Sequence, residues 1–484
     1  MDRRKMYKNI SAILMIAIII SGCSAIKNSS TVTAQRKPNI IFILADDLGY
    51  GDVGFNGQTK IKTPALDLLA KEGMVFTNHY AGSTVCGPSR SSLLTGLTTG
   101  HTTVRGNPGW TTSGGVVDLK SEDVTVGEEL RRAGYHTAVI GKWGLAARDM
   151  NALPTKQGFD YFYGFADHAK AHHYYPEKIW VNDQEEEIKG NVIMEKKGKY
   201  IHDEFTTQAL QYIRSNKDNP FFLYLAYTVP HYELTVPEDS KEPYKNLGWP
   251  VRKMNSRKGQ GYQHDEDGHI AFAGMVSRLD RDIGRITNLL KELNLEEETI
   301  VIFTSDNGPE YDDLENEFFN SNGPFRGKKR DLYEGGIRVP FVVRWKGKIK
   351  EGSTTDHVSA FWDFLPTACH IAGIEPAEKV DGISFLPTLL GNKAQQKKHE
   401  YLYWEFNEKQ GPIQAIRKDN WKAVHFLNDR MELYDLSKDP GEQNNLAAAH
   451  PAMIKQMRDL MANSRTYSEE FQLKKVNNER RKVD

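Results

Sequence analysis

Residues 39–47 read NIIFILADD, and this stretch decides the fold class. Asn39 to Leu44 form a short, continuous and mostly apolar run, which is typical of a strand buried on both faces of a mostly parallel sheet. Thr299 to Thr304 (TIVIFT) and Phe221 to Ala226 (FFLYLA) have the same character. The three runs therefore predict strands of one sheet.

Amphipathic segments alternate with these runs. The segment before Thr299 keeps one helical face apolar through Met275, Leu279, Ile283, Ile286 and Leu290. Val124 to Gly134 (VTVGEELRRAG) has the pattern of another helix, closed by its glycine, and YHTAVIG follows as the next strand. Repeated strand and helix units predict an α/β fold, in which helices cover both faces of a parallel sheet.

Acidic residues follow two of the predicted strands. Asp46 and Asp47 come after the first strand, and Asp306 and Asn307 come after Thr299 to Thr304. The ligand crevice of an open α/β sheet lies outside the carboxyl ends of its strands, where three carboxylates would repel one another without a cation between them. Carboxylate and amide oxygens, with no His or thiolate, suit Ca²⁺ or Mg²⁺ better than zinc. The alternative is a pair of polar turns.

The composition indicates a soluble globular protein. The chain has 484 residues, of which 39% are hydrophobic and 26% charged, and its 63 Lys and Arg balance 64 Asp and Glu. No basic excess indicates a nucleic-acid partner. Three cysteines in a chain of this length argue against a disulfide scaffold. We interpret Cys369, in LPTACHIAG, as a buried thiol, which leaves Cys23 and Cys86 to be placed.

The N-terminus has the pattern of an export signal. Basic residues precede an apolar run from Ala12 to Ile20, shorter than the about 20 residues of a transmembrane span. ISGC, ending at Cys23, resembles a bacterial lipoprotein signal box, whose cysteine is lipidated. We expect a signal peptide over 1–23, a tether over 24–37, and an exported lipoprotein anchored by its lipid in the periplasm or at the outer-membrane surface. An ordinary signal peptide or a cytosolic apolar helix is the alternative.

Six motifs occur in the order typical of the sulfatase family: ILADDLGYGD, CGPSRSSLLTG, GKWG, TVPH, FTSDNG and YEGGIRVP. The resemblance runs from about Pro38 to ELYDLSKDPGEQNNLA near the C-terminus. It implies an alkaline-phosphatase-like α/β fold, with a large, mostly parallel mixed sheet between helices and a smaller C-terminal α+β domain of antiparallel sheet and helix. We place the catalytic domain at 38–396 and the C-terminal subdomain with its tail at 397–484.

The resemblance gives Cys86 a chemical role. In sulfatases the motif cysteine is oxidised by a separate maturase to Cα-formylglycine, and the positions of Pro88 and Arg90 belong to the recognition signal. Beside a cation the aldehyde hydrates to a diol, one oxygen of which attacks sulfur. The alcohol then leaves, and the second hydroxyl expels sulfate. The implied enzyme is a sulfuric ester hydrolase.

The resemblance also assigns the other site residues. The family's metal ligands, commonly to calcium and less often to magnesium, match Asp46, Asp47, Asp306, Asn307 and the modified Cys86. Arg90 would hold the formylglycine, and Lys142 and Lys329 match lysines that grip sulfate oxygens. His231 matches the histidine that contacts the leaving group and can protonate it. Taken alone, each lysine would be interpreted as a solvated surface amine.

Gly144 departs from the family pattern. Many sulfatases have GKWH where this chain has GKWG, and that histidine is assigned to the formylglycine side of the site, where it assists elimination of sulfate. The base for this step is therefore unassigned in the sequence. His101, in TTGHTTVRGN, is a candidate substrate-site residue that could substitute for it. A structural histidine is the alternative.

Residues 164–183, GFADHAKAHHYYPEKIWVND, mix aromatic faces with hydrogen-bonding groups in a way that suits a sugar. His172 is the candidate for contacting the group that bears the sulfate, and a packed aromatic loop is the alternative. An exported sulfatase fits a sulfated glycan or polysaccharide better than a small aryl or alkyl sulfate. Two rivals belong to other classes: a zinc-dependent phosphatase or phosphodiesterase of the same superfamily, and a non-catalytic glycan-binding lipoprotein.

Overall fold

The computed structural model describes residues 36–193, 195–254, 261–310, 317–408 and 412–473. Lys37–Asp484 form one unit, from which Met1–Arg36 are separate. The predicted lipoprotein signal, including Cys23, lies outside the described residues. Within the described ranges, no helix combines the length and the apolar character that a membrane span requires.

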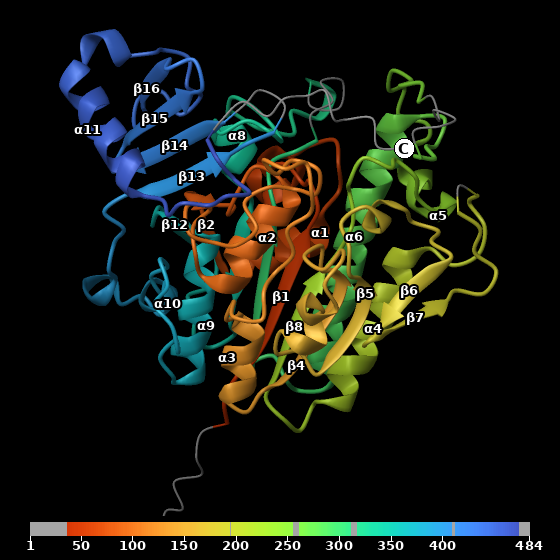
Figure 1. Cartoon of the computed structure of the whole chain (residues 1–484). Helices are drawn as coiled ribbons and strands as arrows, with labels where there is room; N and C mark the ends of the chain where they lie inside the picture. The colour runs from red at the N-terminus through yellow and green to blue at the C-terminus, as the bar shows by residue number, and fades with distance from the viewer. Residues whose placement is uncertain (1–35, 194, 255–260, 311–316, 409–411, 474–484) are drawn as a thin grey trace, which may run out of the picture. The chain divides into compact units, whose positions relative to one another are not determined.

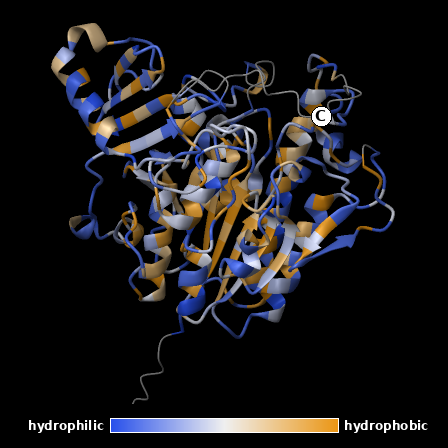
Figure 2. Ribbon diagram, viewed as in Figure 1, coloured by the Kyte–Doolittle hydropathy of each residue, from blue (hydrophilic) through white to orange (hydrophobic). Residues whose placement is uncertain are grey.

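The predicted central strands are confirmed. β1 (Asn39–Ala45) lies between β8 (Phe221–Ala226) and β9 (Thr299–Ser305), and β4 (His136–Lys142) continues the sheet beyond β8, all in parallel. Every residue of β1, β8 and β9 is buried. Figure 1 shows β1 at the centre of the main sheet, and Figure 2 shows these strands as its most apolar part. Continuous apolar runs here reflect burial on both faces.

The main sheet has ten strands in the order β11-β2-β10-β9-β1-β8-β4-β5-β6-β7. Its remaining strands are β2 (Met74–Phe76), β5 (Tyr161–Phe165), β6 (Lys178–Val181), β7 (Gln184–Glu187), β10 (Phe341–Arg344) and β11 (Ser353–Thr355). β5 extends the parallel set, whereas β10 is antiparallel to β9, and β6 is antiparallel to β5. The sheet is therefore mixed but mostly parallel, as predicted. A separate two-stranded sheet pairs β3 (His79–Tyr80) with β12 (Ser359–Ala360).

Helices cover both faces of this sheet. One face carries α1 (Pro64–Lys71), α4 (Ile201–Ser215) and α6 (Gly268–Glu292), and the other carries α2 (Cys86–Thr95), α3 (Val126–Arg132), α9 (Phe364–Ala372) and α10 (Leu386–Leu389). Two further short helices are α5 (Glu238–Lys241) and α8 (Glu334–Ile337). The predicted helices are confirmed as α3 and α6.

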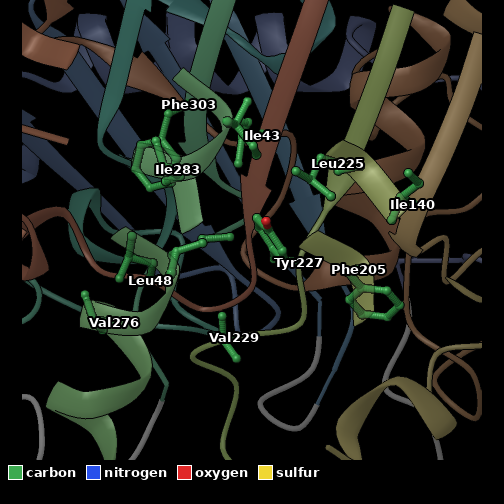
Figure 3. Close-up of a cluster of buried hydrophobic side chains, with 14 of the residues drawn as sticks. Ile43, Leu48, Ile140, Phe205, Leu225, Tyr227, Val229, Val276, Ile283 and Phe303 are labelled. Atoms are coloured by element: carbon green, nitrogen blue, oxygen red, sulfur yellow. The ribbon is translucent and has the colours of Figure 1, made fainter. Parts of the chain in front are cut away.

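Side chains of each central strand alternate between two apolar cores. In the first core, Ile43 of β1 and Phe303 of β9 pack with Ile283 of α6 (Figure 3). The second core takes Phe42 of β1 and, as predicted, the buried thiol of Cys369 in α9. The two cores hold the strands in register and so fix where the strands end.

A second sheet follows in the C-terminal part of the chain. It is antiparallel, with β13 (Leu402–Phe406), β14 (Ile413–Lys418), β15 (Trp421–Phe426) and β16 (Met431–Asp435) in sequence order, followed by α11 (Pro451–Asn463). Trp404 faces a core shared with Tyr80 and Trp362, whereas Tyr403 faces Met457 of α11. The predicted smaller antiparallel sheet with a terminal helix is thus present.

Candidate active site

The carboxyl ends of neighbouring strands bring the predicted acidic residues together. Ala45 of β1 pairs with Ser305 of β9, so Asp46 and Asp306 follow at the same level. Lys142 is the last residue of β4, and His231 follows β8. These side chains meet because the parallel strands end at the same edge of the sheet.

Cys86 lies at this edge as the first residue of α2. It is fully buried, and its Sγ donates to Asp46 Oδ1 at 3.3 Å and lies 4.0 Å from Asp47 Oδ1. The amide N–H of Gly87 donates to Asn107 Oδ1 at 3.0 Å, which fixes the start of the helix. All ten residues of α2 are buried.

Each of the three carboxylates has one close cation, and Asp46 Oδ1 also lies 3.7 Å from Arg90 Nη2. The pairs are Lys142 Nζ with Asp46 Oδ2 at 2.6 Å, Lys329 Nζ with Asp47 Oδ2 at 2.5 Å, and Arg90 Nη2 with Asp306 Oδ2 at 2.7 Å. Arg90 also donates to the backbone carbonyl of Lys142 at 2.7 Å. When all six are ionised, their charges balance, and Glu310 Oε2 adds a further carboxylate 3.5 Å from Lys329 Nζ.

The oxygen atoms of the cluster fit a hard divalent cation. Asp46, Asp47, Cys86 and Asp306 each offer a ligand atom, and these atoms lie within 4.8 Å of one another. The side-chain amide of Asn307 donates from Nδ2 to Asp47 Oδ1 at 2.8 Å, while its buried Oδ1 has no hydrogen-bond partner among the described residues. An unpaired buried carbonyl oxygen is costly, and it is a ligand that calcium and magnesium take.

The electrostatics of the cluster agree with this fit. Burial and the neighbouring Asp46 carboxylate raise the pKa of Asp306 to about 7, although Arg90 opposes them. A cation among the carboxylates would keep Asp306 ionised. Burial raises the pKa of the Cys86 thiol well above its usual value. The unmodified side chain is therefore a protonated thiol and a poor nucleophile.

Histidines border the cluster on one side. His231 Nε2 lies 3.4 Å from Asp47 Oδ2 and 3.3 Å from Lys329 Nζ. The ring of His172 stacks on that of His231 with centroids 3.8 Å apart, and the hydroxyl of Tyr262 lies 3.1 Å from His172 Nδ1. Burial lowers the pKa of both imidazoles, and the nearby lysines act in the same direction. Both histidines are therefore neutral in this arrangement.

The structure does not bring His101 to this cluster. Its Nδ1 lies 2.7 Å from Asp381 Oδ2, in a pocket that is also lined by Trp362, His399 and Tyr403. His101 follows α2 in the chain, whereas Cys86 begins that helix. The contact with Asp381 fits the alternative of a structural histidine, and the substrate-site role of His101 stays a prediction.

A family model described as Sulfatase matches residues 38–374. The chain belongs to the sulfatase family. A second model, described as N-sulphoglucosamine sulphohydrolase, C-terminal, matches residues 325–467. Membership makes the protein a sulfuric ester hydrolase, and the family implies a formylglycine and a metal ion at a site of this kind.

Relatives cover nearly the whole sulfatase. It is 31% identical to an N-acetylgalactosamine-6-O-sulfatase of Bacteroides thetaiotaomicron, over 95% of this chain and 100% of that protein. Human arylsulfatase A is also 31% identical, over 89% of this chain and 88% of that protein. The solved structure of Ps i-CgsB has a TM-score of 0.74 and 28% identity, covering 90% of this chain and 94% of that one. A second structure of Ps i-CgsB contains k-i-k-neocarrahexaose, at the same TM-score and identity, and covers 91% of this chain and 95% of that one.

Sequence reasoning missed two residues around the sulfatase site. Tyr262 belongs to a loop before α6, and no motif marks it. Glu408 follows β13, and its Oε1 accepts a hydrogen bond from the backbone N–H of Asn107 at 3.3 Å, so the C-terminal part of the chain supports the start of α2. Only the tertiary fold joins these segments, so no local signal could have found them.

Proposed function

We propose that this sulfatase removes an O-sulfate group from a sugar of a sulfated glycan or polysaccharide. The observation that carries the proposal is the buried arrangement of three carboxylates and three cations around Cys86. The relatives support a sugar as the group that bears the sulfate. One is named an N-acetylgalactosamine-6-O-sulfatase, and another was solved with k-i-k-neocarrahexaose. His172, Tyr262 and His231 form an aromatic wall with hydrogen-bonding groups, which suits a sugar ring.

The metal of the proposed reaction is calcium, with magnesium as the less suitable choice. Its ligands would be the side chains of Asp46, Asp47, Asp306, Asn307 and the residue made from Cys86. When bound, the cation supplies positive charge that polarises the sulfate ester and activates the formylglycine oxygen. The six charged side chains cancel one another, so a divalent cation would give the site the positive charge that an anionic ester requires.

The chain's own residues have separate tasks in this proposal. Arg90 holds Asp306 and the end of β4 in place through its two sets of hydrogen bonds. Lys142 and Lys329 bring ammonium groups to the sulfate oxygens, where fixed positive charge stabilises the transferring group. His231, whose Nε2 lies 3.3 Å from Lys329 Nζ, would contact the leaving oxygen of the sugar and, once it has taken up a proton, give that proton to the oxygen.

Two partners belong to the proposal. A separate maturase converts Cys86 to formylglycine, and it must act before α2 folds, because the whole helix is buried. The lipid attached at Cys23 would anchor the exported enzyme in the periplasm or at the outer-membrane surface.

The proposal is tested by mass spectrometry of the Cys86 peptide and by turnover. In active protein made with a maturase, we expect the peptide to be about 18 Da lighter than the cysteine form. Sulfated monosaccharides, including N-acetylgalactosamine 6-sulfate, should be hydrolysed with calcium present and not after chelation. An unmodified thiol in active protein would overturn the proposed nucleophile. Preferential hydrolysis of phosphate esters, lost with a zinc-specific chelator, would support the phosphatase alternative instead.

A further inference from the structure

Gly144 lies beside the cluster and has no side chain. Its backbone is left-handed, with φ of +76°, and a Cβ built there would have Lys142 Cε at 3.8 Å and Arg90 Cδ at 3.9 Å among its nearest atoms. These are ordinary van der Waals distances. A side chain at position 144 would therefore fit beside the cations of the site, in a conformation that histidine adopts more readily than most residues.

His168 approaches the same region from the neighbouring strand. Lys142 at the end of β4 pairs with Phe165 at the end of β5, and the pairing continues past both strands. The backbone N–H of Gly144 donates to the carbonyl of Ala166 at 3.1 Å. His168 lies two residues beyond Ala166, so β5 supplies His168 to the same edge to which β1, β4, β8 and β9 supply the other site residues.

The imidazole of His168 has an unused ring nitrogen. Its Nδ1 is buried and has no hydrogen-bond partner among the described residues. The ring packs edge-to-face on His172 with centroids 4.6 Å apart, and His172 stacks on His231. Burial, followed by the charges of Lys142 and Lys329, lowers the pKa of His168 well below its usual value. The imidazole is therefore neutral and can accept a proton through its lone pair.

We propose that His168 is the catalytic base for sulfate release in this sulfatase, in place of the histidine that position 144 lacks. The proposal rests on sulfate-ester hydrolysis at residue 86. The hydroxyl that remains on residue 86 gives its proton to His168 Nδ1, and the bond from the residue 86 carbon to the sulfate oxygen breaks. Its electron pair leaves with sulfate, and the carbonyl of residue 86 forms again.

The test uses mature, full-length protein and para-nitrophenyl sulfate, whose leaving group needs no protonation. Removing a base only from the second step should leave sulfur transfer fast. We therefore expect His168→Ala to release one nitrophenolate per site in a rapid phase, followed by steady turnover roughly 10²-fold or more below wild type. Mass spectrometry of the residue 86 peptide during turnover should show one added sulfo group in the variant.

Two further variants make the test specific. His168→Ala combined with Gly144→His should regain much of the steady rate and lose the added sulfo group, because the new imidazole enters from the vacant position. His370→Ala, which changes an exposed histidine bonded to Ser384, should behave as wild type. His168→Gln keeps a hydrogen-bonding side chain of similar size without a base, and should repeat the His168→Ala result if that protein unfolds.

Other outcomes are equally distinct. An unchanged steady rate in His168→Ala and His168→Gln, with no sulfo group retained, would overturn the role of His168 while wild-type turnover still supports the proposed function. A slow first phase with no retained sulfo group would also overturn it, because the residue would then act before sulfate release. Wild-type protein that carries formylglycine and hydrolyses neither this ester nor any sulfated sugar would contradict the proposed function itself.

Discussion

Lys422 joins the C-terminal sheet to α8 through a buried ion network, and its removal should destabilise the protein measurably. Its Nζ lies 2.9 Å from Glu334 Oε1 and 3.0 Å from Glu442 Oε1, and the three side chains are fully buried. Glu334 is the acidic residue of the YEGGIRVP motif and begins α8, whereas Lys422 belongs to β15. Lys422→Met keeps the aliphatic length and leaves two carboxylates without this cation.

The magnitude follows from what remains around the carboxylates. Removing one partner of a buried ion pair costs about 3–5 kcal/mol of unfolding free energy. In the variant, Glu334 keeps its ion pair with Arg338 at 3.1 Å and the hydrogen bond from the Tyr80 hydroxyl at 2.7 Å. Burial, opposed by Lys422, raises the pKa of Glu442 to about 7. Without Lys422, Glu442 can therefore take up a proton, which avoids leaving a buried unpaired charge. We therefore expect the lower end of the range, about 3 kcal/mol at pH 8.

The pH dependence has a definite sign. The pKa of Glu442 is higher in the folded protein than in the unfolded chain, so this group lowers the stability as pH rises from its unfolded pKa to its folded value of about 7. At pH 5.5 Glu442 is mostly protonated in the folded state, so Lys422 forms an ion pair with Glu334 but not with Glu442. The destabilisation by Lys422→Met should therefore be smaller at pH 5.5 than at pH 8.

Urea unfolding followed by tryptophan fluorescence measures both effects. Lys438→Met is the matched control, because Lys438 is 83% exposed and pairs with Asp435 at 3.2 Å. An exposed pair of this kind contributes about 0–1 kcal/mol. A loss below about 1 kcal/mol for Lys422→Met at pH 8, or a larger loss at pH 5.5, would refute the reasoning.

Further predictions concern the site. Cys86→Ala should abolish turnover of every sulfate ester while thermal unfolding stays near that of wild type, and residual turnover would contradict the assigned nucleophile. His231→Ala should slow hydrolysis of a sugar sulfate roughly 10²-fold more than that of an aryl sulfate, whose alcohol leaves unprotonated, as steady-state kinetics will show. Calcium at about 100 times its dissociation constant should stabilise the protein by about 2.7 kcal/mol. Asn307→Ala should raise the calcium concentration needed for that shift in a thermal melt, and an unchanged requirement would exclude Oδ1 as a ligand.

The central part of the fold could be predicted because strands buried on both faces have continuous apolar sequences. β1, β8 and β9 are covered on both faces, so all their residues are apolar or buried and the runs are unmistakable. The edge strand β7 is the opposite case, since its four residues, Gln184–Glu187, are all exposed. β7 is a strand because it pairs with β6, and no apolar pattern in the sequence predicts that pairing.

The site residues that could be predicted are those at strand ends or within motifs. Asp46 and Asp306 were placed together because parallel strands end at one edge. Tyr262 and Glu408 could not be placed, since they reach the site from loops whose course depends on tertiary packing. His101 shows the limit of closeness in sequence as a guide, because its side chain contacts Asp381, 280 residues away.

The charge balance of the cluster gives a physical reason why a bound cation would help this sulfatase to bind an anionic substrate. Lys142 and Lys329 are the groups that would grip sulfate, yet in the described arrangement each is paired with an aspartate within 2.6 Å. An anionic ester would have to compete with those carboxylates in a buried, neutral site, which is unfavourable. A divalent cation would compensate the aspartates and leave the lysine charges for the sulfate oxygens. In the proposed site the same carboxylates would be metal ligands, and they also hold the lysine ammonium groups in place.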